Sequence, residues 1–193
     1  MLIIVRHGRT EANAAGRLLG HLDLPLDSLG ERQAVALAQA VGPVDRVVSS
    51  PLLRTRQTAT AFGLDVEVDE RFIELDYGDF DGMPLTDVPS EMWRQWRLDS
   101  DFAPPGGESL SSLRLRVESG LADLAAEAQS KNIVVSTHVS PIKVAITWAL
   151  GVGDDVTWQM FVAPASIHRV AVLTTGTSLR TFNEIAHLQT ISD

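Results

Sequence analysis

Residues 1–10 read MLIIVRHGRT, so that an Arg, a His and a Gly follow directly on a run of aliphatic residues. The run at 2–5 has the composition of a strand that is buried on both faces, which is typical of the parallel sheet of an α/β protein. Ligands of such sheets bind where strands end and loops begin. The run therefore predicts that Arg6 and His7 lie at a ligand-binding edge of the sheet.

The three residues that follow the run suit the chemistry of a phosphoryl group. The imidazole of His7 is a candidate nucleophile, because a neutral imidazole is available near pH 7. Arg6 is a permanent cation whose planar fork of donors matches phosphoryl oxygens, and Gly8 allows a close approach of backbone. On these three residues alone, His7 is equally well interpreted as a strand-end histidine with an ordinary hydrogen bond.

Three later segments each bring one more polar group of the kind that phosphoryl transfer needs. Arg54 lies one turn into a helix that follows a strand, Glu74 lies among apolar residues ahead of a glycine turn, and His138 ends a strand. The segments are VVSSPLLRTRQTA at 47–59, RFIELDYGDFDG at 71–82 and NIVVSTHVSPIK at 132–143.

Taken in order, these motifs resemble a known family. RHG, then S-x-L-x-R-x-x-Q-T-A, then a Glu before a G-x-[FW]-[DE]-G turn, then a strand that ends in His, is similar to the histidine phosphatase superfamily, also called the phosphoglycerate mutase-like family. The resemblance spans nearly the whole chain. It implies a single α/β domain over residues 1–193 with three layers, in which helices flank both faces of a mixed, mostly parallel sheet.

The resemblance also implies roles for individual residues. It makes His7 the residue that is phosphorylated, places Arg6, Arg54 and His138 in the phosphate pocket, and makes Glu74 the proton donor. A cationic cradle of this kind needs no metal, since the protein mainly positions the phosphoryl group and stabilises its charge. Neither a metal nor a cofactor is therefore expected.

The chain departs from the family pattern at two positions. Val139 stands where the family usually has Gly after the second His, and Thr55 stands where the family favours Ala. If the backbone amide at 139 contacts phosphate, Val139 can still supply it, but from a more restricted backbone. Residues two apart on a helix point about 200° away from each other, so only one of Arg54 and Arg56 is expected to face the pocket, and the resemblance selects Arg54.

Composition limits the remaining classes of function. The 193 residues include no Cys, which excludes disulfides and thiolate catalysis. The net charge of −9 argues against nucleic acid as a partner. No apolar run approaches the roughly 20 residues that span a bilayer. The chain opens directly into a strand, so a cytoplasmic location is expected. His21, His168 and His187 lack the close spacing of zinc ligands.

Periodicity and turn residues predict alternating strands and helices. The predicted strands lie near 2–6, 45–49, 65–68, 132–137, 167–174 and 178–184. The predicted helices begin at Asp27 or Ser28 and end near 41, run from 51 to about 62 and from 108 to 129, and begin at Pro141 and end at Gly151.

Other candidate residues have structural and functional interpretations side by side. Asn13 and His21, after the first strand, match positions that contact substrate in the family. Asn13 serves turn formation equally well, and for His21 a solvated position is slightly favoured. The irregular segment 83–107 is a candidate lid, although Trp93 and Trp96 within it more often belong to a satellite core.

Two more residues, Arg9 and His168, complete this set. A solvated position is slightly favoured for Arg9, which lies in the same loop as Asn13, and a core position is favoured for His168.

Hydrolysis of a small phosphorylated metabolite is the expected function. A cofactor-dependent mutase is the alternative, but it needs extra cations and a tight lid, and the connection from Glu74 to His138 lacks a basic insertion. A third interpretation is a catalytically weak module that binds phosphorylated ligands, which Val139 alone supports. The oligomeric state is left open, with a homodimer as one option.

Overall fold

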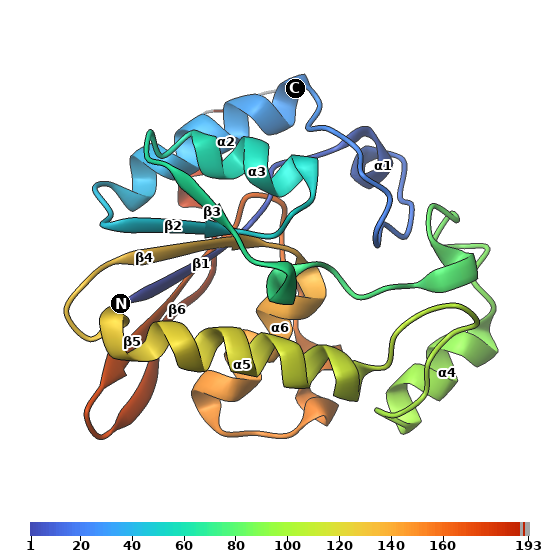
Figure 1. Ribbon diagram of the computed structural model, residues 1–193. Helices are drawn as coiled ribbons and strands as arrows, with labels where there is room; N and C mark the ends of the chain where they lie inside the picture. Colours follow the sequence, from blue (N-terminus) through green and yellow to red (C-terminus); the bar gives the residue numbers. More distant parts are fainter. Residues whose placement is uncertain (190, 192–193) are drawn as a thin grey trace.

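Three largely aliphatic strands lie parallel at the centre of the computed structural model, which describes residues 1–189 and 191 (Figure 1). The sheet has six strands in the order β3-β2-β4-β1-β5-β6, and β5 runs antiparallel to its neighbours β1 and β6. The strands are β1 (Leu2–Arg6), β2 (Arg46–Ser49), β3 (Val66–Val68), β4 (Ile133–Thr137), β5 (Ile167–Leu173) and β6 (Gly176–Glu184).

These strands confirm all six predicted ones and give the expected single α/β domain with a mixed, mostly parallel sheet. Residues 190, 192 and 193 of the predicted domain range lie outside the described residues.

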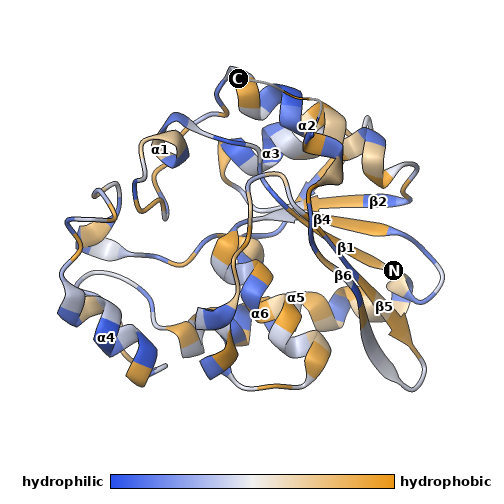
Figure 2. Cartoon of the chain, turned by 180° about the vertical axis from the view of Figure 1, so that it is seen from behind, coloured by the Kyte–Doolittle hydropathy of each residue, from blue (hydrophilic) through white to orange (hydrophobic). Residues whose placement is uncertain are grey.

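Helices cover both faces of the sheet (Figure 1). Side chains alternate along a strand, so Ile3 and Val5 of β1 pack with α2 and α3, whereas Leu2 and Ile4 pack with α5 and α6 on the other face. The central strands are coloured as hydrophobic along most of their length in Figure 2. The covering helices are α2 (Ser28–Val41), α3 (Leu53–Thr60), α5 (Leu110–Ala128) and α6 (Val139–Leu150).

The helix boundaries follow from their capping residues. Asp27 caps α2, because its Oδ1 accepts the Gly30 N–H at 2.7 Å. Gly151, at φ 66°, ends α6 in the left-handed conformation. The start of α6 differs from the prediction: it begins at Val139, two residues before Pro141. A proline fits there because the first N–H groups of a helix have no partner within the helix.

The irregular segment after Glu74 forms a small aromatic unit beside the main core. Helix α4 (Ser90–Leu98) lies at one side of the domain, away from α2 and α3 (Figure 1). Trp96 is 2% exposed and packs with Leu18 and Val88, so it belongs to a satellite core, as favoured from the sequence. Trp93 is half-buried against the same cluster. The short elements are α1 (Glu11–Ala14), η1 (Glu70–Phe72), η2 (Gly78–Phe80), η3 (Asp154–Gln159) and η4 (Ala186–Leu188).

Gly8 brings the loop after β1 against the start of α2. A Cβ atom at Gly8 would lie 2.3 Å from the Gly30 carbonyl oxygen, so no other residue fits without moving backbone. The close approach that Gly8 allows is therefore to another glycine of the same chain.

Within the described residues, no helix combines the length and the apolar character needed to traverse a bilayer.

Candidate active site

The register of the parallel strands brings three polar residues to one edge of the sheet. Arg6 pairs with Thr137 across β1 and β4, and Ser136 pairs with Ser49 across β4 and β2. The next residue along each strand is therefore at the same edge: His7, His138 and Ser50. The rings of His7 and His138 meet edge to face, with centroids 5.2 Å apart.

His7 is held as a neutral imidazole with one nitrogen free. Its Nδ1–H donates to the Gly8 carbonyl at 2.7 Å, since a carbonyl can only accept. This bond places the remaining lone pair on Nε2. Burial lowers the pKa of His7 well below its ordinary value, and the positive charges of Arg54 and Arg6 lower it further. The imidazole is therefore uncharged at neutral pH, as a nucleophile requires.

His138 is also neutral, which changes the expected source of positive charge. Burial lowers the pKa of His138 well below its ordinary value, with Arg54 and His7 acting in the same direction. Its Nε2 lies 2.8 Å from the Ser50 hydroxyl, which orients the ring, and its buried Nδ1 has no hydrogen-bond partner among the described residues. The positive charge of the expected cradle therefore lies on the two arginines, and His138 contributes a neutral ring.

The guanidinium groups of the half-buried Arg6 and the buried Arg54 supply that charge. Arg6 donates from Nη1 to the Val162 carbonyl at 2.7 Å, and Arg54 donates from Nη1 and Nη2 to the carbonyls of Leu22 and Gly20 at 2.8 and 2.7 Å. In the described part of the chain, the buried Nε of each arginine has no hydrogen-bond partner. Buried donors and charges are normally satisfied, so the pair is suited to an anion.

The expected contrast between the two arginines of α3 is observed. Arg54 is fully buried and Arg56 is exposed. Thr55, the milder departure from the family pattern, is also buried, and its hydroxyl donates to the carbonyls of Ser50 and Leu52 at 3.0 and 2.7 Å. The hydroxyl that Thr55 adds relative to Ala is thus satisfied by backbone carbonyls just before the helix.

Glu74 is 3% exposed and binds the first turn of α6. Its Oε2 accepts the Val139 N–H at 3.0 Å, and its Oε1 accepts the N–H groups of Ser140 at 3.1 Å and Leu75 at 2.8 Å. A carboxylate suits the positive end of a helix. The Val139 amide therefore faces Glu74, and Val139 has a helical backbone that needs no glycine.

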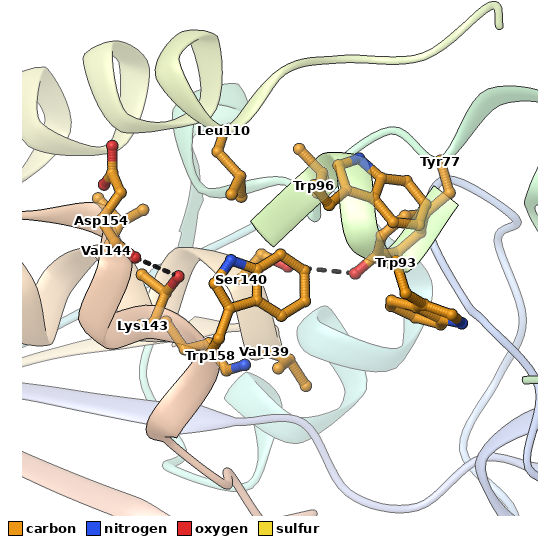
Figure 3. Close-up of a pocket in the computed structure, with 12 residues that line it drawn as sticks. Tyr77, Trp93, Trp96, Leu110, Val139, Ser140, Lys143, Val144, Asp154 and Trp158 are labelled. Atoms are coloured by element: carbon orange, nitrogen blue, oxygen red, sulfur yellow. Dashed lines mark hydrogen bonds between the residues drawn. The ribbon is translucent and has the colours of Figure 1, made fainter. Parts of the chain in front are cut away.

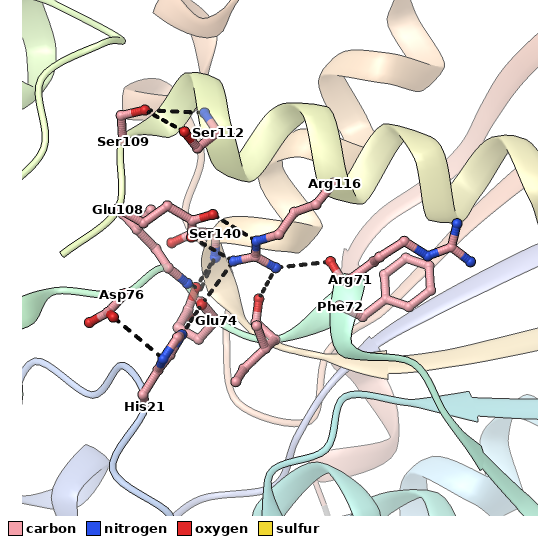
Figure 4. A network of polar contacts seen from close by, with 12 residues as sticks. His21, Arg71, Phe72, Glu74, Asp76, Glu108, Ser109, Ser112, Arg116 and Ser140 are labelled. Carbon is pink, nitrogen blue, oxygen red and sulfur yellow. Dashed lines mark hydrogen bonds and ion pairs between the residues drawn. The ribbon is translucent and has the colours of Figure 1, made fainter.

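A clamp of polar side chains holds the backbone that carries Glu74 (Figure 4). Arg116 of α5 donates to the carbonyls of Arg71, Ile73 and Glu74 at 2.9, 2.7 and 3.0 Å. The same guanidinium pairs with both oxygens of Glu108 at 2.8 and 2.7 Å. Arg116 thus binds three backbone carbonyls of this loop and holds them against α5.

His21 lies against the Glu74 loop, and Asn13 lies in the short helix α1. His21 lies beside the site, where its Nε2 bonds to the Glu74 carbonyl at 2.8 Å and its Nδ1 lies 3.6 Å from Asp76. Asn13 completes a capping box with Thr10, whose N–H donates to Asn13 Oδ1 at 3.1 Å. Asn13 therefore has a local structural function in α1.

Arg9 and His168 serve the scaffold. Arg9 pairs with Asp27 at 2.7 Å. His168 is fully buried, with Nε2 3.1 Å from the Ser166 hydroxyl and Nδ1 accepting the Asn183 N–H at 3.1 Å. A core position, as favoured from the sequence, is confirmed for His168.

Three residues near the site were not singled out from the sequence. Ser50 orients His138, Ser140 supplies an amide to Glu74, and Arg116 clamps the Glu74 loop. Ser50 ends a strand like His7 and His138, and this position is a signal that could have identified it. Arg116 carries no such signal, because it lies within an ordinary amphipathic helix 42 residues after Glu74 in the chain.

Comparison with known proteins matches this chain to one protein family. The profile of the histidine phosphatase superfamily, branch 1, matches residues 2–185. A bifunctional protein of Mycobacterium tuberculosis is 32% identical over 198 residues, which cover 97% of this chain and 54% of that protein. The chain thus spans about half the length of this curated relative.

Two phosphatases are similar over a larger share of their own length. Phosphoserine phosphatase 1 of Hydrogenobacter thermophilus is 35% identical over 168 residues, which cover 82% of this chain and 80% of that protein. The solved structure of a mutant phosphoserine phosphatase from Entamoeba histolytica, in complex with phosphoserine, has a TM-score of 0.88 and 27% identity and covers 97% of this chain and 98% of its own.

Proposed function

This chain belongs to the histidine phosphatase superfamily, and we propose that it hydrolyses small phosphate monoesters, without a metal ion, through a phosphohistidine formed on His7. One observation carries the proposal. The neutral His7, whose Nε2 carries the lone pair, lies beside Arg6 and Arg54, and the Nε of each arginine has no hydrogen-bond partner among the described residues. A dianionic phosphoryl group suits both features: its phosphorus is an electrophile for His7, and its oxygens accept hydrogen bonds from the two arginines.

The first chemical step transfers the phosphoryl group to the enzyme. His7 Nε2 forms a bond to phosphorus as the bond from phosphorus to the ester oxygen breaks. The leaving oxygen takes a proton from the carboxyl group of Glu74, so that it departs as a neutral alcohol. Arg6 and Arg54 stabilise the charge on the three equatorial oxygens, and they need little rearrangement because their Nη groups are already fixed by backbone carbonyls.

The second step returns the enzyme to its starting state. Water attacks the phosphohistidine, the bond from phosphorus to Nε2 breaks, and Glu74, now a carboxylate, takes the proton that the water loses. Inorganic phosphate is released, and His7 regains its lone pair. The amides of Val139, Ser140 and Leu75 bind the carboxylate form of Glu74 between the two steps.

The charges around the aromatic unit support hydrolysis over mutase activity. A mutase must hold a substrate carboxylate with several further cations, yet three arginines of the Glu74 to His138 connection pair with carboxylates of this chain. Arg94 pairs with Glu91 at 2.6 Å, Arg116 pairs with Glu108, and Arg114 pairs with Asp154 at 2.5 Å. A coupled assay for phosphoglycerate isomerisation is expected to show no activity above the rate of phosphate release.

Phosphate release from 4-nitrophenyl phosphate tests the proposal, measured with and without a chelator. We expect release that the chelator leaves unchanged, and loss of at least about a thousandfold in His7→Ala, because the covalent route is then closed. Wild-type rates in His7→Ala would remove the nucleophile from His7. Loss of activity on chelation would remove the metal-independent part of the proposal.

A further inference from the structure

A cavity of about 180 Å³ lies beside the proposed catalytic groups, and the proposed reaction does not use it (Figure 3). Its lining includes Leu75, which follows Glu74, and Val139 and Ser140, whose amides hold the Glu74 carboxylate. The other walls come from α4, from the start of α5 and from η3. A leaving group that receives a proton from Glu74 would therefore emerge next to this cavity.

The walls of the cavity are aromatic. Figure 3 shows Trp93, Trp96 and Tyr77 on one side and Trp158 on the other. The rings of Trp93 and Trp158 meet edge to face, with centroids 6.4 Å apart, and the Tyr77 hydroxyl is engaged with the Ser140 hydroxyl at 3.2 Å. An apolar cavity of about 150 Å³ is large enough to bind benzene, so this volume accommodates a group of the size of one ring.

One cation in the lining, Lys143, has no counterion among the residues that the structure describes. Lys143 is half-buried, and its Nζ lies 5.7 Å from the centroid of the Trp158 ring. Asp154 is the carboxylate in the lining, and it is paired with Arg114 at 2.5 Å. Burial lowers the pKa of Lys143, and the charge of Glu74 opposes that shift. A partly buried ammonium without a carboxylate partner is costly, and an anionic ligand group would compensate it.

We propose that this cavity binds the alcohol part of the substrate, and that this part has an apolar body of about one ring in size and carries an anionic group that pairs with Lys143. The inference rests on the proposed function, because it places the ester oxygen at Glu74. A neutral aryl group fills the volume but leaves Lys143 unpaired.

Binding is measured first with two phosphonates that the enzyme cannot hydrolyse, benzylphosphonate and 4-carboxybenzylphosphonate. Three of the four tryptophans line the cavity, so quenching of tryptophan fluorescence reports its occupation. We expect the carboxylated probe to bind at least about tenfold more tightly, because a hydrogen-bonded charge pair contributes that much. The ratio of the two affinities is expected to fall to near one in Lys143→Met and to persist in Lys143→Arg.

Lys131→Met is the matched control, since Lys131 is the other lysine of the chain and pairs with Glu127 on the surface. It is expected to keep the wild-type ratio. A ratio near one in the wild type, or an unchanged ratio in Lys143→Met, would overturn the assignment and leave the cavity as a structural void only. Circular dichroism of each variant, measured first, shows that the ratios compare folded proteins.

Hydrolysis of phenyl phosphate and 4-carboxyphenyl phosphate separates this inference from the proposed function. Release of phosphate from both esters at equal kcat/KM, with equal affinities for the phosphonates, would retain the phosphatase and remove the subsite. A Lys143-dependent preference among the phosphonates, without release of phosphate from either ester, would retain the subsite and remove the phosphatase.

Discussion

Replacing Arg116 with Met removes the charged head that holds the Glu74 loop while keeping most of the apolar stem. Five hydrogen bonds are lost, three of them to the backbone carbonyls of Arg71, Ile73 and Glu74 and two to Glu108. The three carbonyl bonds are charge-assisted but water can replace part of each, so about 1 kcal/mol apiece is a reasonable net value. The Glu108 pair is about one-fifth exposed and adds at most about 1 kcal/mol.

These contributions give an expected loss of about 3–4 kcal/mol in the free energy of unfolding. For a chain of this length, each 1 kcal/mol lowers Tm by about 2–4 °C. Thermal unfolding followed by circular dichroism measures this loss. Arg56→Met is the control, because Arg56 is exposed on α3, and its effect should stay within about 0.5 kcal/mol.

A second assay separates positioning from stability. If Arg116 positions Glu74, the Arg116→Met variant loses more kcat with an alkyl phosphate than with 4-nitrophenyl phosphate, whose leaving group needs little protonation. We expect a loss of about 10- to 100-fold with the alkyl ester at a temperature where the variant is fully folded. A variant that unfolds at the wild-type Tm, or that loses equal activity on both esters, would refute the reasoning.

Three further outcomes follow from the site. The pKa values of His7, His138 and His168 are lowered in the folded state, to about 4 for His168, so the unfolded chain binds more protons below pH 6.5. The free energy of unfolding should therefore fall as pH drops from 6.5 towards 4, with a slope approaching about 4 kcal/mol per pH unit for three protons. Urea unfolding with a midpoint that is constant from pH 7 to 5 would contradict this. Glu74→Gln should lose most activity towards alkyl phosphates and less towards 4-nitrophenyl phosphate in initial-rate assays, and equal losses would remove its function as proton donor. Ser50→Ala should lower kcat about tenfold because His138 loses its 2.8 Å partner, and kinetics identical to the wild type would show that this bond does not orient the ring.

The sheet could be predicted from the sequence because the signals that specify it are local. The aliphatic runs before His7 and His138 are long enough to mark buried strands, and Asp27 marks a helix start through its own side chain. Parallel pairing then brings the ends of these strands to one edge whatever the loops do. For that reason, residues that lie more than 130 positions apart in the chain meet as an imidazole pair.

Features that depend on several distant segments at once could not be predicted in this way. The clamp of Arg116 requires that α5 pack with Arg116 directly opposite the carbonyls of Ile73 and Glu74. The hydrophobic periodicity of α5 does not specify that alignment. The neutral state of His138 depends on complete burial near two arginines. The aromatic cavity forms only where α4, α6 and η3 converge, and the sequence indicates Trp93 and Trp96 merely as apolar residues in an irregular segment.

The phosphohistidine itself is the most direct test of the account. The enzyme is mixed with 4-nitrophenyl phosphate, quenched at alkaline pH within milliseconds, digested and analysed by mass spectrometry. The account predicts an added phosphoryl group on the peptide that contains His7, which is stable in base and lost in acid, and which is absent from the His7→Ala variant. Turnover without this adduct at any quench time, or an adduct on another residue, would contradict the central claim.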